Sequence, residues 1–474
     1  MGVQPLVPLE ARSPEAMARL VHDRSLRFAR RAVQWPGGDV PTEQALMAGL
    51  ERFSVLLTGE RAYLKTEAGQ AAALMAANQL ARLFLHLQVE IPSDIALRVV
   101  QPLGEAATTL EQAVMATITA VYPWGSIARF GDGPAVHAIL ALGGVDSDSL
   151  PEGVFVVRAR GAGWMVRVGE PAEGPCFAAG QNPMGALVSV AFAALEVYKA
   201  FLRKLLPSGV EPNWDLTAAA GFTLSLLDYS RAGSGHEFDA LPASIDLGDV
   251  TFVSAGAMAH CALYGLLAAG ARGHGRVTEP KTLDEPDLNR YMLAGAADLD
   301  AVKPELFAAR AGPALSLDWE SRRYQDSTHR ALLQAEERHA PLAILGVDHP
   351  PSRIDVQRDW PNVLVNGATE HSQICVSRHS ATDSDLACIE CVTPNEEPLG
   401  DEPIPTLGPV SAIAGLLLAA EVIKERTPGL AGWRLQGLMW VSTLRPDSMF
   451  GVRPTSPPAR PDCACQERLQ LTGS

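Results

Sequence analysis

The sequence has no run of basic residues, and its N-terminus has no apolar leader. The chain of 474 residues carries a formal net charge of −15. Because phosphate binding needs clustered Lys and Arg, we expect no nucleic-acid partner. The first residues lack the charged start and long apolar segment of a signal peptide. They also lack the Ser or Thr at position 6 that N-myristoylation requires. The expected location is therefore cytoplasmic.

Long uncharged segments are scarce. The stretch 250–271 is the segment that we consider as a possible membrane span. It is uncharged and long enough to span a bilayer. Its first residues are β-branched or aromatic and its later residues are rich in Ala and Leu. We therefore expect a strand at 250–253, a turn at 254–256 and a helix at 257–269. A membrane span is the alternative, and the polar residues of the stretch oppose it.

Cysteine is infrequent, with seven residues, but four of them form two close pairs. Cys388 and Cys391 form a C-x-x-C pair, which is common in zinc knuckles, and Cys463 and Cys465 form a rarer C-x-C pair. The sequence predicts a structural Zn²⁺ site that ties the C-terminal tail back to the sheet. Free buried thiols are the alternative.

Two segments of the first part of the chain resemble two segments of the second part, in the same order. The pairs are AILALG at 138–143 with AILGVD at 343–348, and ALEVYK at 194–199 with AAEVIK at 419–424. A duplicated fold is the prediction, with chance similarity as the alternative. Since Gly143 stands where the second copy has Asp348, we expect one working half and one supporting half.

Strands and helices alternate along the chain, which predicts an α/β fold with mainly parallel sheets. We expect an N-terminal helical region at 1–65, a first half at 66–240 and a second half at 241–474. Within the first half, a strand is expected at 97–100 and a helix at 216–227.

The strand, turn and helix at 250–269 are arranged as in a nucleotide-binding loop. The three positions that glycine occupies in such loops hold Ser254, Gly256 and Ala259. Glu279 follows at a distance suited to a ribose hydroxyl. An NAD-dependent oxidoreductase has the same layout, but the missing glycines oppose it.

Charged residues follow this loop in an order that suits a triphosphate. Arg290 and Lys303 would neutralise phosphate charge. Asp348 ends a predicted parallel strand, where a carboxylate is well placed for Mg²⁺, and Arg353 follows it. The alternatives are solvated surface charges for Arg290 and Lys303 and a helix cap for Asp348.

The order of these parts resembles the ubiquitin-activating superfamily of ThiF/MoeB/HesA-type adenylating enzymes. The resemblance covers about 249–466 and rests on VSAGAMA at 253–259, EPKTLDEPDLNR at 279–290, Lys303, Asp348 with Arg353, the helix after Gly408-Pro409 and the two cysteine pairs. It implies two Rossmann-like halves packed as a pseudo-dimer, with a degenerate N-terminal half and a nucleotide-binding C-terminal half. It also implies ATP and Mg²⁺ as cofactors.

The chemistry implied is adenylation of the C-terminal carboxylate of a ubiquitin-like protein or peptide, with loss of pyrophosphate. A downstream conjugating protein would be a further partner. By resemblance, Asp348 holds Mg²⁺, Arg290 and Lys303 steady the phosphates, and Glu279 binds ribose. The other expected nucleotide contacts are Ser254, Gly256, Ala257, Asn289 and Arg353. Candidates for an Arg supplied by the partner half are Arg27, Arg30 and Arg31.

The sequence departs from the family pattern at several positions. Ser254 and Ala259 replace glycines, Lys281 replaces an Asp, and Asp287 replaces the family Asn. Asp401 stands where many relatives carry a thioester-forming Cys, and the spare Cys375 falls within a strand pattern typical of a core. These departures favour the second hypothesis, a catalytically impaired scaffold that binds a ubiquitin-like partner.

Overall fold

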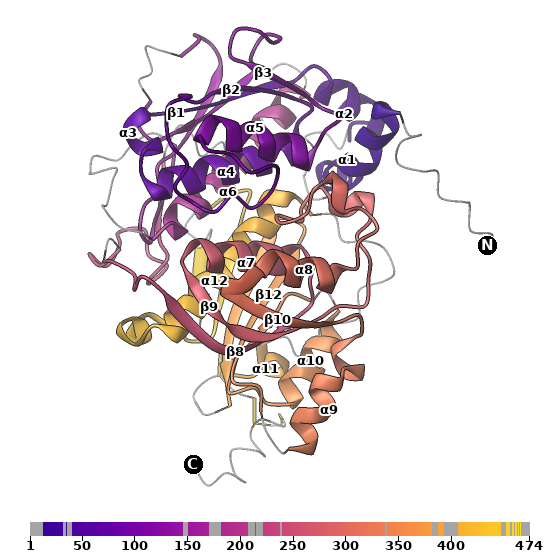
Figure 1. The fold of residues 1–474 in the computed structure, drawn as a ribbon, viewed down its shortest axis with the longest axis vertical. Coiled ribbons are helices and arrows are strands. Elements are labelled where there is room, and N and C mark those ends of the chain that lie inside the picture. Colours follow the sequence, from indigo (N-terminus) through magenta and orange to yellow (C-terminus); the bar gives the residue numbers. More distant parts are fainter. Residues whose placement is uncertain are drawn as a thin grey trace, which may run out of the picture.

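The computed structural model has two α/β halves, drawn one above the other in Figure 1. The first half, in indigo to magenta, lies above the second half, which runs from rose through orange to yellow. The structure describes residues 13–31, 35, 40–145, 150–169, 182–206, 214, 221–237, 239–336, 339–347, 349–381, 387–392, 406–446, 452–455, 457–458, 460–461, 463 and 465.

The first half is built on a seven-stranded sheet of order β3-β2-β1-β4-β5-β6-β7. The first five strands in this order, β3, β2, β1, β4 and β5, are parallel to one another. Strands β6 and β7 extend the sheet with antiparallel pairing. The strands are β1 (Ser54–Gly59), β2 (His86–Glu90), β3 (Ser126–Arg129), β4 (Ala138–Leu142), β5 (Phe155–Ala159), β6 (Met165–Val168) and β7 (Phe222–Ser225).

The second half is built on an eight-stranded sheet of order β10-β9-β8-β11-β12-β13-β14-β15. Its first five strands are parallel and its last three are antiparallel. The strands are β8 (Ile245–Val253), β9 (Ala271–Thr278), β10 (Leu315–Glu320), β11 (Ala343–Leu345), β12 (Val363–Glu370), β13 (Gln373–Ser380), β14 (Leu438–Ser442) and β15 (Val452–Thr455).

The two sheets share one topology, because each strand of the first occupies the same place in chain order as its counterpart in the second. The similar segments that begin at 138 and 343 form β4 and β11, the fourth strand of each sheet. This confirms both the α/β class with two Rossmann-like halves and the duplication.

Helices connect the strands in both halves. In the first half they are α1 (Pro14–Arg31), α2 (Glu43–Leu50), α3 (Arg61–Leu64), α4 (Glu67–Leu83), α5 (Leu110–Val121) and α6 (Met184–Lys204). In the second half they are α7 (Ala257–Ala268), α8 (Lys303–Ala311), α9 (Thr328–Ala335), α10 (Pro350–Arg358), α11 (Ile389–Val392) and α12 (Gly408–Arg426), with the 3₁₀ turns η5 (Glu285–Asp287), η6 (Ala296–Asp298), η7 (Gly312–Ala314), η8 (Tyr324–Asp326) and η9 (Pro428–Trp433).

Helices α6 and α12 contact each other where the two halves meet. Helix α12 also packs closely on α7, because a Cβ at Gly415 would lie 2.2 Å from the carbonyl oxygen of Met258. In the part of the chain that the structure describes, α6 alone is long and apolar enough to cross a membrane, and its apolar window is 100% buried in the fold. The stretch 250–271 forms a strand, a turn and a helix, as expected.

Three expected elements differ in the structure. The region 1–65 is not all helical, because it contains β1, the middle strand of the parallel part of the first sheet. In the described part of the expected helix at 216–227 the prediction is wrong, since 222–225 alternates apolar and polar residues and pairs with β6 as β7. The expected strand at 97–100 is also wrong: only the neighbouring Ala96 makes a single bridge, to Thr109.

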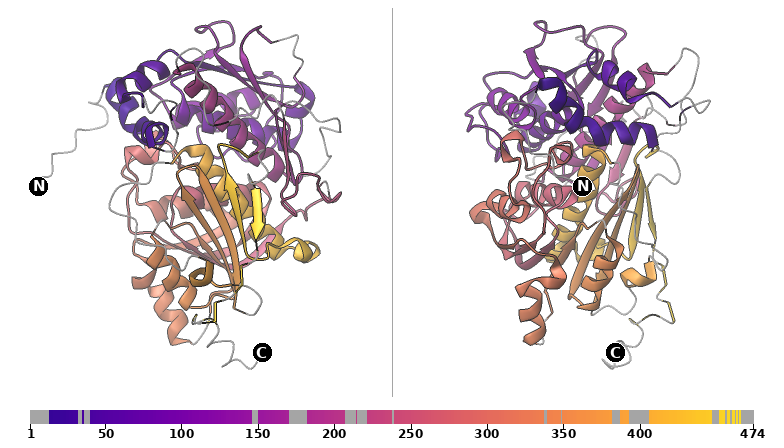
Figure 2. Two further views of the ribbon diagram at one scale, coloured as in Figure 1. Left: turned by 180° about the vertical axis from the view of Figure 1, so that it is seen from behind. Right: turned by 90° about the vertical axis from the view of Figure 1, so that its right-hand side faces the viewer.

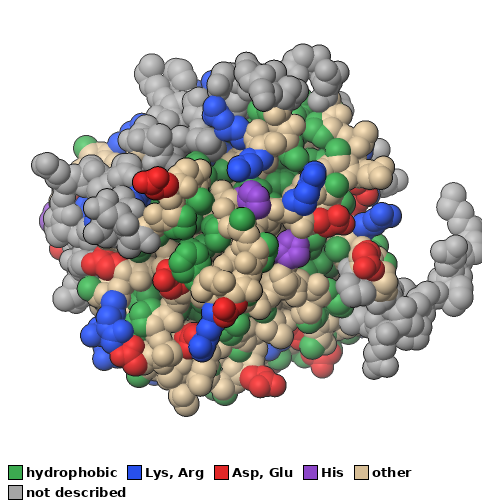
Figure 3. Space-filling model, turned by 90° about the horizontal axis from the view of Figure 1, so that it is seen from above, with side chains coloured by type: hydrophobic (Ala, Val, Ile, Leu, Met, Phe, Trp, Pro, Cys, Tyr) green, Lys and Arg blue, Asp and Glu red, His purple; other side chains and the backbone are tan. Residues whose placement is uncertain are grey.

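Figure 2 shows the same arrangement of halves from behind and from the side, with the antiparallel strands β13 to β15 at one edge of the lower half. The face of the first half drawn in Figure 3 carries Lys and Arg side chains interspersed with Asp and Glu. That face therefore presents no continuous basic surface.

Candidate functional site

The strand order of the second sheet reverses between β8 and β11. Ligands of open α/β sheets bind at this point, beyond the carboxyl ends of the strands. After β8 the chain makes a short turn through Ser254 and Gly256 into α7. Ser254 has φ 93°, a left-handed conformation that glycine adopts at much lower cost. Ser254 therefore holds a glycine backbone conformation without being glycine.

The Ser254 side chain occupies the turn that it forms. Its Oγ accepts a hydrogen bond of 2.9 Å from the backbone N–H of Gly256 and donates one of 3.2 Å to Glu279. A phosphate bound at this turn would need such N–H groups. The N–H of Gly256 is thus already engaged by a side chain of the protein.

Asp287, Arg290 and Lys303 form a buried cluster of charges. Lys303 Nζ lies 2.8 Å from Asp287 Oδ2, and Arg290 lies 3.5 Å from Asp287 Oδ1. The side chains of Lys303 and Asp287 are 5% and 4% exposed. One carboxylate therefore offsets one of the two cations, which leaves the cluster with a single excess positive charge.

Tyr291 joins this cluster to the turn. Lys303 Nζ lies 4.9 Å above the Tyr291 ring and the Arg290 guanidinium lies 5.8 Å from its centre, as cation–π contacts. A Cβ at Gly256 would lie 4.0 Å from the Tyr291 hydroxyl and 3.8 Å from the Gly346 carbonyl at the end of β11. The cationic cluster and the turn therefore border the same space.

The protonation of this cluster is fixed well away from neutral pH. Burial disfavours charged Lys303, but the neighbouring Tyr291 and Asp287 outweigh burial and raise the pKa of Lys303. Burial, with the Asp287 charge, raises the pKa of Tyr291 to about 12. Lys303 is thus a fixed cation and Tyr291 a neutral hydroxyl across the working pH range.

Several buried polar atoms around the cluster lack a partner among the described residues. Asn289 is 0% exposed, yet neither its amide oxygen nor its amide nitrogen is hydrogen-bonded. The same holds for Arg290 Nη1 and Thr278 Oγ1. Buried polar atoms are normally satisfied, so their concentration here indicates a place for a polar ligand or water. The order of charges after the loop had indicated Arg290 and the family resemblance had indicated Asn289, whereas neither Tyr291 nor Thr278 carried a sequence signal.

Asp348, the expected metal ligand, lies outside the described residues. Arg353 is buried on α10, and its Nε donates to the carbonyl of Val347, next to Asp348. Ala257 is the first residue of α7, and Ala259 lies two residues later on the same helix. Lys281 has an exposed side chain, and its carbonyl accepts from the backbone N–H of Lys303.

The first half supports the segment that carries this cluster. Arg82, on α4 and 0% exposed, donates to the carbonyl oxygens of Leu288, Met292 and Ala294. Asn78 adds a hydrogen bond to Met292. The position of Arg290 and Tyr291 therefore depends on a helix of the other half.

The four paired cysteines meet in one cluster. Cys388, Cys391, Cys463 and Cys465 are buried, and their sulfur atoms all lie within 4.8 Å of one another. Neighbouring sulfurs are 3.3, 3.6 and 3.7 Å apart. A tetrahedron with Zn–S bonds of about 2.3 Å has edges of roughly 3.8 Å, so the sulfurs fit Zn²⁺. Arg460 supports the cluster, because its backbone N–H donates to Cys391 Sγ.

The remaining expected residues have separate places. Arg27, Arg30 and Arg31 line a pocket on α1 together with Asp23, Leu26, Val40 and Glu43, all from the first half. Arg27 pairs with Asp23 at 3.0 Å. Cys375 is 5% exposed in β13, as a core residue should be. Asp401 lies outside the described residues.

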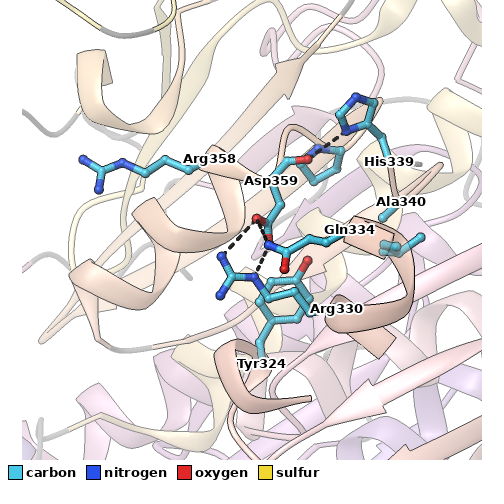
Figure 4. Close-up of a pocket in the computed structure, with 9 residues that line it drawn as sticks. Tyr324, Arg330, Gln334, His339, Ala340, Arg358 and Asp359 are labelled. Atoms are coloured by element: carbon cyan, nitrogen blue, oxygen red, sulfur yellow. Dashed lines mark hydrogen bonds and ion pairs between the residues drawn. The ribbon is translucent and has the colours of Figure 1, made fainter. Parts of the chain in front are cut away.

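A further pocket lies between α9 and α10, near the cysteine cluster (Figure 4). Arg330 forms a bidentate ion pair with Asp359, at 2.7 and 3.0 Å, above the ring of Tyr324. Arg358 lies at the rim of the pocket and pairs with Glu390, which stands between Cys388 and Cys391 in the sequence. The charges of this pocket satisfy one another, so its geometry indicates packing of α9 on α10 rather than a site.

No protein-family model matches the sequence, and no curated protein matches it. Solved structures of the enzyme MccB are similar in fold. The structure described as "Crystal structure of E. coli MccB + ATP" has a TM-score of 0.35 and 16% identity, covering 46% of this chain and 66% of that chain. MccB "in complex with N-formylated MccA", a microcin C7 biosynthetic enzyme, has a TM-score of 0.37 and 16% identity, covering 46% and 67%. This chain thus spans about two thirds of the MccB structures or slightly less.

Proposed function

We propose that the protein uses ATP to adenylate the C-terminal carboxylate of a peptide or ubiquitin-like protein. The observation that carries the proposal is the shared space at the strand reversal, where Arg290, Lys303 and Tyr291 border the turn at Gly256. Two cations beside a loop of this kind suit a triphosphate. The ordered motifs that resemble the ThiF/MoeB-type enzymes support the same reaction.

In the proposed reaction, a carboxylate oxygen of the substrate attacks the α-phosphorus of ATP, and the bond to the bridging oxygen breaks. An acyl-adenylate forms and pyrophosphate leaves. The protein performs no covalent step, so its contribution is the placement of fixed positive charge where negative charge develops. Lys303 is suited to this task because its charge does not titrate near neutral pH. Mg²⁺, held by Asp348, would supply further charge neutralisation.

The proposal ends at the adenylate. Among the described residues outside the four-cysteine cluster, the remaining thiols, Cys261 and Cys375, are buried. A thioester nucleophile needs an exposed thiolate in an electropositive environment. A downstream conjugating protein that accepts the acyl group, and a cytoplasmic location in which the thiols stay reduced, complete the proposal.

ATP–pyrophosphate exchange with peptides that end in glycine tests this function. Exchange is expected for the wild type, with a loss of about a hundredfold or more for Lys303→Met, since a charge-assisted contact contributes on the order of 3 kcal/mol. Asp348→Asn should show a comparable loss. Arg272→Ala, an exposed substitution at the start of β9, is the matched control. Equal exchange in wild type and Asp348→Asn would refute the proposal.

The second candidate is a scaffold that binds a ubiquitin-like partner without turnover. Two observations favour it: Ser254 occupies the N–H of Gly256, and Asp287 neutralises Lys303. Titration with Mg²⁺ and ATP separates the candidates, because tight binding contradicts a scaffold. Asp287→Asn restores the family residue and frees Lys303, so it should tighten ATP binding by about tenfold, or ~1.4 kcal/mol.

A further inference from the structure

A pocket with a volume of about 290 Å³ lies between the two halves, away from the proposed reaction. The first half contributes the start of α4 and the segment 98–102, and the second half contributes the end of α7. Helix α7 has the turn at Gly256 at its N-terminus and this pocket at its C-terminus. The volume is at the lower end of the range of small-molecule sites.

One nearly buried residue that lines this pocket has a polar group without a partner among the described residues. Tyr264 is 5% exposed, and its hydroxyl makes no hydrogen bond. A nearly buried polar group without a partner costs free energy. The pocket thus offers a hydroxyl group to a ligand.

The rim carries both signs of charge, and the wall is apolar. Arg98 and Glu67 are exposed, and neither has an ion-pair partner in the described part of the chain. Val100, from the first half, is 77% exposed, and it lines the pocket together with apolar residues of the second half such as Leu267. A ligand that matches these walls has a carboxylate, an ammonium group and an apolar side chain.

We propose that this pocket binds a free α-amino acid with an apolar side chain. Its carboxylate meets Arg98 and the Tyr264 hydroxyl, and its ammonium group meets Glu67. Its side chain covers Val100. Because the bound amino acid contacts both halves, it stabilises their association. This inference does not depend on adenylation.

Calorimetric titration of the full chain with leucine and phenylalanine tests the proposal. Saturable binding with one ligand per chain is expected. Analogues that lack either the carboxylate or the ammonium group should bind at least about tenfold more weakly, since each loses a charge-assisted contact. No binding of either amino acid at millimolar concentration overturns the proposal, as does equal binding of the deaminated analogue.

Matched variants locate the ligand. Tyr264→Phe should weaken binding by about tenfold and leave the unfolding midpoint unchanged, because the hydroxyl has no described partner. Arg98→Ala should weaken binding at least as much, with Arg129→Ala, an exposed arginine on β3, as its control. Ala268→Trp, which fills the pocket, should abolish binding. Wild-type affinity in both Tyr264→Phe and Ala268→Trp contradicts the assignment, whatever the outcome of the exchange assay.

Discussion

The two halves share a topology but differ at the point where their strand order reverses. In the second half a short turn leads from β8 to α7, and a Cβ at Gly256 would lie 2.9 Å from Ser254 Oγ of the same turn. In the first half the connection from β1 to α4 is longer and includes α3. Glu60 of this connection accepts a 2.6 Å hydrogen bond from the N–H of Gly144, and a Cβ at Gly143 would lie 2.7 Å from Tyr63. In the first half, side chains of the longer connection therefore lie against the residues that follow β4.

The halves also resemble each other in how they are joined. Glu196 and Lys199 on α6 form a buried ion pair of 2.5 Å, and so do Glu421 and Lys424 on α12. Lys199 donates to a carbonyl of the second half, at Leu444. Lys424 donates to carbonyls of the first half, at Leu226 and Leu227. Each half therefore holds the other through the same pair of residues, as a pseudo-dimer does.

The largest expected effect concerns the cysteine cluster, which the first half lacks among its described residues. Cys463→Ala should remove one Zn²⁺ per chain and lower the free energy of unfolding by about 4 kcal/mol, because the remaining thiolates lose their metal. Metal analysis and urea unfolding measure both changes. Cys375→Ala, outside the cluster, should keep its metal. Full metal content in Cys463→Ala would be incompatible with a four-thiolate site.

Arg82→Ala tests whether the first half positions the site of the second. The loss of a buried cation that holds three carbonyls should cost about 3 kcal/mol or more of unfolding free energy. ATP binding should weaken beyond detection in the folded variant, since Arg290 and Tyr291 lose their support. Arg129→Ala, whose side chain is 72% exposed, is the control. Unchanged ATP affinity in Arg82→Ala would show that the two halves act independently.

The paired helices permit a matched double-mutant cycle. Lys424→Met leaves Glu421 buried without its cation and should cost about 3 kcal/mol, whereas the double variant Glu421→Gln with Lys424→Met should cost less. The same order is expected for Glu196 and Lys199 if the halves are equivalent. Urea unfolding of the two single variants and the double variant of each half, six proteins in all, measures these free energies of unfolding. The two halves would not be equivalent if, in one half only, the double variant were less stable than either single variant.

The smallest expected effect is a shallow pH dependence shared by both halves. Burial lowers the pKa of His22 in the first half to about 4, and burial, aided by nearby cations, lowers the pKa of His260 in the second half to about 3. Each imidazole binds a proton in the unfolded chain near its ordinary pKa of about 6.5, whereas in the folded protein it binds one only at lower pH. Their contribution is therefore complete above pH 6.5 and is lost as the pH falls toward the folded pKa values.

Urea midpoints at pH 7.5 and pH 5, bracketing the unfolded-chain pKa of about 6.5, check this dependence. The decrease should shrink in His22→Phe and in His260→Phe by similar amounts. His274→Ala, on β9, serves as the control. A decrease that neither buried histidine influences would assign the pH dependence to other groups.

The sequence predicted much of the second half. Alternation of apolar strands and Ala-rich helices placed α7 close to its observed bounds and placed the end of β8 correctly, although β8 begins five residues before the expected strand. The matched segments also predicted the shared topology. The spacing of the cysteine pairs predicted their meeting, because paired thiols at such spacing suit a single ion.

Two strands of the first half were harder to predict from the sequence. Strand β1 lies within a region that appeared helical, and β7 was mistaken for a helix. Both are short strands whose state depends on pairing with β2, β4 or β6, which a local pattern does not contain.

The sequence by itself determined the duplicated α/β fold, the cysteine cluster and the order of Arg290 and Lys303, because periodicity and spacing are local properties. Only the tertiary structure decided that Tyr63 of α3 lies against Gly143, that Asp287 neutralises Lys303, and that Arg82 of one half supports the site of the other. These outcomes depend on contacts between residues distant in the chain, whose distances and burial are set by packing of the two halves.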